Sequence, residues 1–194
     1  AANRLTGTLP PELGAMSSLR VLFLYENQLT GPLPPEFGQL TRLEDLIIND
    51  NHLAGTIPYS VGSNLNKMRA IFLQGNAFTG MLDTDFFKNS DVETLDITNN
   101  QLTGQLPAGL FEARNLKTLA LSINCFTGSL PASICSMTKA LVISLDGLGA
   151  ATACKGTVHF PITNIKLFNT LEGTIPTCVW HLRNLTLLHM AGVR

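Results

Sequence analysis

A short phrase, LxxLxLxxN, returns along almost the whole chain and limits what the sequence can fold into. It occupies residues 19–27 and 43–51, and its apolar columns return before Asn76, Asn100 and Asn124. Subtracting successive asparagine positions, counted from Asn3, gives 24, 24, 25, 24 and 24 residues. A coil this short cannot bury its apolar face alone, so the coils must stack into a solenoid.

The alternating leucines of the phrase predict one short strand in each coil. Successive side chains of a strand point to opposite faces, so the leucines enter the core and the residues between them form a surface. Stacked coils then lie about 4.8 Å apart, and each sequence column becomes a continuous row. Burial of one such leucine stabilises the fold by roughly 1.5–3 kcal/mol. The asparagine is expected to turn inward and to bond backbone groups that would otherwise be buried unpaired.

A second phrase follows the asparagine and narrows the fold class. LTGxLP or a close variant occupies residues 29–34, 53–58, 102–107 and 126–131. The combined pattern resembles the plant-type leucine-rich repeats of receptor kinase ectodomains, receptor-like proteins and polygalacturonase-inhibiting proteins. The resemblance implies an α/β repeat solenoid, a right-handed superhelix with a concave parallel β-sheet and convex short 3-10 helices or turns. Two further stretches, SLDGL at 144–148 and GTIPTCVW at 173–180, are similar to leucine-rich-repeat proteins of diatoms.

We expect residues 1–194 to form one leucine-rich-repeat domain. Terminal coils of solenoids normally need a polar cover, and no such cap is recognisable here, so the chain is expected to be an internal part of a longer protein. The repeat falters between residues 135 and 161, where an irregular coil bracketed by cysteines is expected, and resumes at 169–176. Asp83 replaces the proline that stands at this position in other coils, which predicts a short capped turn with Asp83 or Thr84 as N-cap.

Composition argues against several classes of function. The formal net charge of −1 predicts no attraction to nucleic acid or to an anionic membrane. No apolar run approaches the roughly 20 residues of a membrane span. His52, His159, His181 and His189 lack metal-ligand spacing, and GxSxG, HExxH and phosphate-binding glycine loops are missing from the sequence. We therefore expect neither an enzyme nor a cofactor or metal.

Four cysteines flank the expected irregular coil. Cys125, Cys135, Cys154 and Cys178 form an even set at the place where packing is weakest, which favours disulfides in an oxidising compartment. Four free thiols in a cytosolic protein are the alternative. Three connectivities are possible, and we predict that Cys125 pairs with Cys154 and Cys135 with Cys178. This choice requires the shortened coil to bring the outer pair within ~7 Å.

One glycosylation sequon is present, at Asn184-Leu185-Thr186. It precedes a predicted strand at the outer edge of the coil, so a glycan on Asn184 is expected in an extracellular protein. An unmodified surface asparagine is the alternative.

Two solvent-facing columns of the predicted sheet are the candidate binding surface. The column between the last two leucines contains Phe23, Ile47, Phe72, Asp96, Ala120 and Ser144. The column two residues before the asparagine contains Tyr25, Asn49, Gln74, Thr98, Ser122 and Asp146. Successive large apolar residues on a surface tend to mark a contact site. The ligand-binding residues are predicted to be Phe23, Tyr25, Ile47, Asn49, Phe72, Gln74 and Asp96, with an acidic rim at Glu26, Glu44, Asp45, Asp50 and Glu93.

These columns and the resemblance predict an extracellular recognition module, secreted or at the cell surface, that binds a protein or peptide on its concave face. It would be a receptor ectodomain or a secreted binder; a soluble inhibitor similar to the polygalacturonase-inhibiting proteins is an alternative. Ice or mineral binding is a minor alternative, based on the outward column Thr30, Ala54, Thr79, Thr103 and Thr127. That threonine belongs to the shared LTG phrase, where its hydroxyl is expected to fix a turn. Scattered outward hydrophobic residues without a function are a further interpretation.

Overall fold

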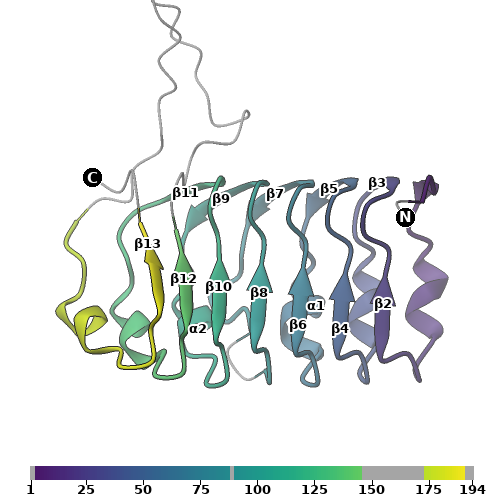
Figure 1. The fold of residues 1–194 in the computed structure, drawn as a ribbon. Helices are drawn as coiled ribbons and strands as arrows, with labels where there is room; N and C mark the ends of the chain where they lie inside the picture. The colour runs from purple at the N-terminus through teal and green to yellow at the C-terminus, as the bar shows by residue number, and fades with distance from the viewer. Residues whose placement is uncertain (1–2, 88–89, 146–172, 191–194) are drawn as a thin grey trace, which may run out of the picture.

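The computed structural model describes residues 3–87, 90–145 and 173–190. In these ranges the chain winds as a right-handed solenoid, in which each coil rises along a front sheet, turns over and returns behind it (Figure 1). The predicted leucine-rich-repeat solenoid is thereby confirmed.

The front sheet is built from the LxL phrase of each coil. Its parallel strands are β2 (Val21–Phe23), β4 (Asp45–Ile47), β6 (Ala70–Phe72), β8 (Thr94–Asp96), β10 (Thr118–Ala120), β12 (Val142–Ser144) and β13 (Leu187–His189). Each central residue pairs with its own equivalent, as Leu22 does with Leu46 and Leu46 with Ile71. The sequence columns therefore lie in register across this sheet, as the repeat predicted.

A second parallel sheet, here called the back sheet, was not predicted. Its strands are β1 (Thr6–Thr8), β3 (Gln28–Gly31), β5 (His52–Thr56), β7 (Ala77–Met81), β9 (Gln101–Gln105) and β11 (Cys125–Thr127). Most of them contain the LTG phrase or a close variant, so this phrase forms a strand and not only the predicted turn. Neighbouring strands here are offset by two residues, so Thr30 pairs with His52 and not with its column equivalent Ala54.

Two glycines of the back sheet occupy positions where a side chain does not fit. Gly31 has φ +80°, and a Cβ there would lie 2.8 Å from Cγ2 of Thr8 in the preceding coil. Gly80 has the same geometry over Thr56. A side chain at either position would meet both an unfavourable backbone conformation and a neighbouring side chain.

Short helices cover the side of the coils opposite the front sheet. They are η1 (Pro11–Ala15), η2 (Pro35–Gln39), α1 (Tyr59–Asn64), α2 (Ala108–Phe111), η3 (Ala132–Ser136) and η5 (Thr177–His181). A proline precedes each one, and before all but η5 its backbone is extended, for example Pro34 with φ −64° and ψ 134°. Proline suits this position because its φ is fixed and it has no N–H to leave unpaired.

The coil that begins after Asn76 departs from this pattern. Asp83 stands in place of the proline, and a turn at residues 84–87 stands in place of a helix. The Asp83 Oδ1 accepts a hydrogen bond from the Asp85 N–H at 3.0 Å, so the predicted capping role of Asp83 is confirmed. Below it, Phe86 and Phe87 pack edge to face at 4.3 Å between ring centroids.

The asparagine column forms a hydrogen-bonded ladder through the core, as predicted. Asn100 is 2% exposed, and its Oδ1 accepts a bond from Phe78 N–H at 3.0 Å in the preceding coil. Its Nδ2 donates to the carbonyl groups of Leu73, Ile97 and Thr98 at 3.1–3.3 Å. The turn before each ladder asparagine needs positive φ, which Glu26, Asp50, Gly75, Asn99 and Ile123 adopt.

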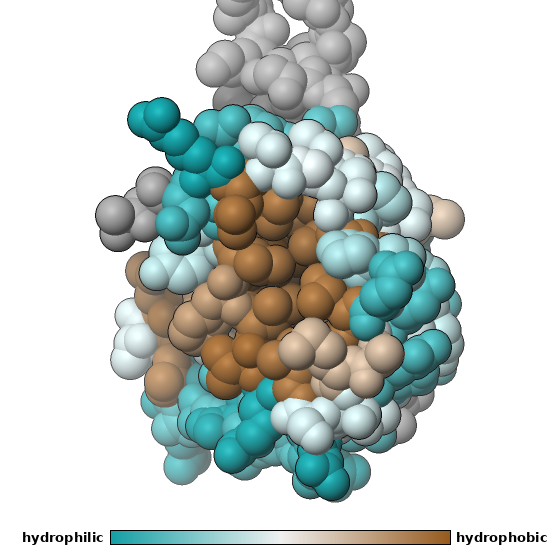
Figure 2. Space-filling model, turned by 90° about the vertical axis from the view of Figure 1, so that its right-hand side faces the viewer, coloured by the Kyte–Doolittle hydropathy of each residue, from teal (hydrophilic) through white to brown (hydrophobic). Residues whose placement is uncertain are grey.

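The first coil packs less tightly than those that follow. Leu19, Leu22 and Leu24 are only partly buried, whereas their equivalents Leu43, Leu46 and Ile48 are fully buried. Figure 2 views the solenoid from this end and shows the apolar side chains as one continuous surface.

The expected irregular coil at 135–161 is only partly within the described residues. Its first part is regular, since β12 pairs in register with β10 on one side and with β13 on the other. The remainder, residues 146–161, and the expected return of the repeat at 169–172 lie outside the described residues.

Candidate functional site

The predicted apolar column lies as one row across the front sheet. Phe23 pairs with Ile47, and Ile47 with Phe72. The same row continues through Asp96, Ala120, Ser144 and His189. Its β2 to β6 part is apolar, and its β8 to β13 part carries small or polar side chains.

The exposed end of this row forms an aromatic pair with Tyr25 of the second column. Phe23 is 57% exposed and Tyr25 is 47% exposed, and their rings meet edge to face at 6.4 Å between centroids. Ile47 lies on β4 and Phe72 on β6, each with a neighbouring strand on both sides, and both side chains are half-buried. Val21, the other outward residue of β2, is also exposed. The surface therefore offers a ligand a broad apolar area at one end.

The second predicted column carries polar groups beside this apolar area. Asn49 donates from Nδ2 to the Asp50 carboxylate at 2.7 Å. The Oε1 atom of Gln74 is buried and has no hydrogen-bond partner among the residues that the structure describes. Further along, Ser122 and Ser144 share a hydrogen bond of 2.8 Å between their hydroxyls. Asp96, in the first column, is turned toward its own strand end, where its Oδ1 accepts the Thr98 N–H at 2.9 Å.

A ladder of alternating charges borders the row, and it was missed at the sequence level. Its members stand two residues before the central leucine position: Arg20, Glu44, Arg69, Glu93 and Lys117. Arg20 Nη2 lies 2.7 Å from Glu44 Oε1, and Arg69 Nη2 lies 3.6 Å from Glu93 Oε1. Lys117 Nζ forms a second ion pair with Glu93. Glu44 and Glu93, two members of the predicted acidic rim, are therefore each paired with basic neighbours.

These contacts favour the ionised forms of both carboxylates. The hydrogen bond from Arg20 lowers the pKa of Glu44, and the charges of Arg69 and Lys67 add to it. The hydrogen bond from Lys117 likewise lowers the pKa of Glu93. Hydrogen bonding to a charged carboxylate stabilises that form.

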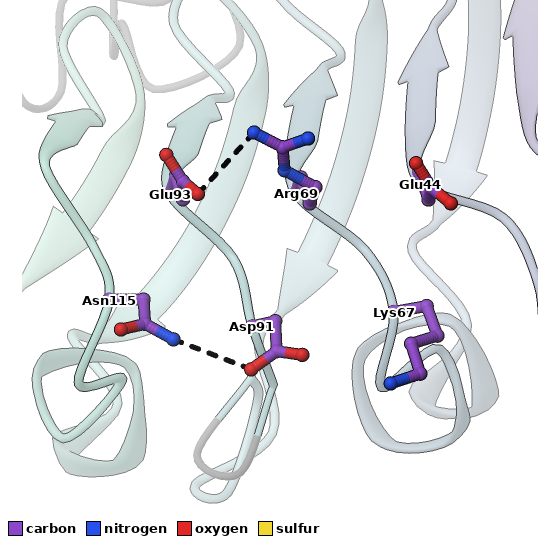
Figure 3. A pocket seen from close by; sticks show the side chains of 6 residues that line it. All are labelled: Glu44, Lys67, Arg69, Asp91, Glu93 and Asn115. Carbon is purple, nitrogen blue, oxygen red and sulfur yellow. Dashed lines mark hydrogen bonds and ion pairs between the residues drawn. The ribbon is translucent and has the colours of Figure 1, made fainter.

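A polar hollow of about 280 Å³ lies along this ladder (Figure 3). It is lined by Glu44, Lys67, Arg69, Asp91, Glu93 and Asn115. Asn115 donates to the Asp91 carboxylate at 3.3 Å. Three carboxylates and two basic side chains meet here, so the hollow offers polar and charged contacts of both signs to a ligand that crosses the coils.

The predicted threonine column does not form a straight row. Thr30, Thr103 and Thr127 are exposed on the back sheet, and Thr79 is half-buried there. However, Thr79 pairs with Gln101 and not with Thr103, because of the two-residue offset. The prediction that threonines of neighbouring coils lie in a straight row about 4.8 Å apart is therefore wrong. The ice-binding alternative depended on that row.

The described residues include one complete disulfide. It joins Cys135 in η3 to Cys178 in η5, with 5.5 Å between the Cα atoms. This is the outer pair of the predicted connectivity. Cys125 is also disulfide-bonded, and Cys154, its predicted partner, lies outside the described residues. Asn184 is exposed, and its Nδ2 donates to the Thr138 carbonyl at 2.8 Å.

The described part of the chain shows no grouping typical of a metal site. Within it, no cluster of three or more His, Cys, Asp or Glu side chains is placed to hold a metal ion. The same residues contain no helix long and apolar enough to cross a membrane.

Comparisons with known proteins agree with this architecture. The family model described as Leucine Rich Repeat matches residues 18–40, 91–112 and 115–137. A search of curated proteins found no match. Among solved structures, a TDR receptor is 28% identical with a TM-score of 0.76, covering 98% of this chain and 33% of the receptor.

Two further solved structures are similar. The Arabidopsis receptor kinase HAESA, in complex with the peptide hormone IDA and the co-receptor SERK1, is 26% identical with a TM-score of 0.76, covering 99% of this chain and 33% of the receptor. A plant ice-binding protein is 22% identical with a TM-score of 0.61, covering 97% of this chain and 63% of that protein, and this likeness concerns the fold alone. The chain thus spans about a third of the receptors it matches. It is a solenoid of plant-type leucine-rich repeats, built like those of receptor-kinase ectodomains.

Proposed function

We propose that the front sheet binds a peptide or an extended protein segment, as part of an extracellular recognition protein. The observation that carries the proposal is the in-register apolar row of Phe23, Ile47 and Phe72, with Tyr25 beside it. Exposed aromatic residues commonly supply most of the energy of a protein interface. The similar receptor HAESA, whose structure contains a peptide hormone, supports a peptide as the class of ligand.

The composition of the row indicates how such a ligand would lie. Its apolar side chains would pack over β2, β4 and β6, and its polar groups over β8, β10 and β12. The Oε1 of Gln74 is buried and has no partner among the described residues, so rotation of this side chain would offer an acceptor to a peptide N–H. Because the charge ladder is internally paired, the ligand needs little net charge, and its affinity should depend weakly on salt.

The test is a selection of peptides from a displayed random library on the purified chain, followed by measurement of the best peptide on variants. Phe23→Ala with Phe72→Ala should weaken binding by about 30-fold or more, since truncation of such anchors typically costs about 2 kcal/mol or more. The control is Thr103→Ala on the back sheet, which should bind normally. Unchanged binding in the double variant, with loss in the control, would place the site on the other face.

We also propose an extracellular location, supported by the Cys135–Cys178 disulfide, because such bonds persist in oxidising compartments. The exposed sequon supports glycosylation of Asn184. A protein secreted from eukaryotic cells should lose mass on treatment with an N-glycosidase, and the Asn184→Gln variant should not.

A further inference from the structure

An apolar groove of about 850 Å³ lies away from the front sheet, where the strands of the back sheet end and the helices begin. It runs across the coils that contain β5, β7, β9 and β11. Its lining residues are Thr56, Ile57, Pro58, Tyr59, Met81, Leu82, Asp83, Thr84, Phe86, Gln105, Leu106, Pro107, Ala108, Ser129 and Pro131.

The irregular turn at residues 84–87 shapes this groove. Phe86, from that turn, lies so close to Gly62 of α1 that a Cβ on the glycine would be 2.3 Å from the ring. The ring of Phe86 is almost fully buried, as are Leu82 and Leu106 beside it. The floor of the groove is therefore fixed and apolar.

The walls of the groove are large, exposed side chains that do not belong to the buried core. Met81 is 70% exposed and Tyr59 is 56% exposed. Met81 occupies a column that carries polar residues in the other lining coils, namely Thr56, Gln105 and Ser129. An exposed methionine is an adaptable apolar contact, and a tyrosine adds a flat ring with one polar end.

The charge of the lining has one sign. Asp83 is the one ionisable carboxylate among the described lining residues, and no Lys, Arg or His lines the groove with it. Its Oδ1 holds the turn through the Asp85 N–H. A carboxylate at the edge of an apolar groove favours a cation and disfavours an anion.

We propose that this groove is a second binding site, for a small apolar molecule that carries a cationic group. The volume lies within the range of small-molecule sites, about 300–1,000 Å³, and the lining is mostly apolar with a few polar groups, as such sites require. The apolar body of the ligand contacts Met81, Tyr59 and Phe86, and its ammonium or guanidinium group faces Asp83. The site is separate from the front sheet and does not depend on peptide binding there.

The experiment uses octylammonium, 1-octanol and octanoate, each titrated into the purified chain by calorimetry below its aggregation concentration. Octylammonium should bind tightest, up to about fivefold tighter than octanol, as expected for one exposed ion pair. Octanoate should bind weakest. Equal affinities for octylammonium and octanoate, or no binding of any probe at millimolar concentration, would overturn the proposal.

Two variants with matched controls locate the site. Asp83→Asn keeps an oxygen acceptor for the Asp85 N–H, so the turn should persist while octylammonium binding falls to the level of octanol. Met81→Ser should weaken octylammonium and octanol alike. The controls are Asp91→Asn, on the other side of the coils, and Met16→Ser, an exposed methionine of the first coil, and both should bind as the wild type does.

Thermal unfolding of each variant verifies that it is folded. A folded Asp83→Asn variant that still prefers the ammonium, or a folded Met81→Ser variant with wild-type affinity for both probes, would show that the probes bind elsewhere.

Discussion

Replacement of Asn100 by alanine tests the asparagine ladder directly. The change removes one acceptor and one donor group from a position that is 2% exposed. Three carbonyl groups lose a donor, but each retains another: Leu73 from Asn76 at 3.1 Å, Ile97 from Asn124 at 2.9 Å, and Thr98 from the Gly75 N–H at 3.0 Å. The Phe78 N–H loses the acceptor that Asn100 Oδ1 supplies at 3.0 Å.

The expected loss of stability follows from the hydrogen bonds that this substitution removes. An unsatisfied buried donor costs about 1–3 kcal/mol, and the remaining lost bonds add a smaller amount, so we expect about 3 kcal/mol in total. With a urea slope of about 2 kcal/mol/M, the midpoint of unfolding should fall by about 1.5 M. Circular dichroism measures all coils, whereas the fluorescence of Trp180 measures the coil that contains η5. Both should shift together if the solenoid unfolds as one unit.

Asn27→Ala is the matched control. Asn27 Oδ1 accepts the N–H of Leu5 at 3.0 Å, but Leu5 is half exposed, so water can replace the lost acceptor. The loss should therefore be about 1 kcal/mol or less. Equal losses for the two variants, or a wild-type midpoint for Asn100→Ala, would refute the argument that buried backbone groups depend on the ladder.

Three further predictions concern strain, charge and covalent linkage. Ile123 is β-branched yet has φ +56°, so Ile123→Asn should stabilise the chain by about 1 kcal/mol and raise its melting temperature. Glu93 has a lowered pKa, so its stabilising effect is present above its ordinary value of 4.5 and is lost as the pH falls. Denaturation of Glu93→Gln should therefore show a smaller fall in stability on acidification than the wild type. Replacing Cys135 and Cys178 with alanine should cost about 2–4 kcal/mol, measured by denaturation against the oxidised wild type.

The front sheet and the asparagine ladder were predictable because both depend on the period of the repeat. Spacings of 24 and 25 residues align the columns, and LxL alternation determines which side chains point out. The position of Phe23 beside Ile47 followed from the same counting. The inward asparagine followed from the need to pair backbone groups at the turn.

The back sheet was missed for a physical reason. Most of its strands contain the glycine of the LTG phrase or of a close variant, and glycine inside a run lowers the expectation of a strand. Its hydrogen bonds come from neighbouring coils and not from local preference. The two-residue offset that pairs Thr30 with His52 has no counterpart in the sequence period.

The charge ladder had a visible signal that was not used. The column of Arg20, Glu44, Arg69, Glu93 and Lys117 alternates in sign, and comparison of the same position in successive coils would have revealed it. The groove beside Met81 had a weaker signal. Asp83 marked an irregular turn, but the shape of the surface above it depends on how Phe86 and Gly62 pack.

The different registers of the two sheets determine how each face can change over evolution. On the front sheet, one substitution alters one place in a row and leaves neighbouring backbones untouched, so single mutations can diversify what the surface recognises. On the back sheet, Gly31 and Gly80 lie beneath threonine side chains of the preceding coil, so a larger residue at either position requires a change in its neighbour as well. Duplication or loss of a whole coil leaves the strand register of both the front sheet and the back sheet unchanged. The solenoid can therefore lengthen by recombination while its recognition surface varies by point mutation.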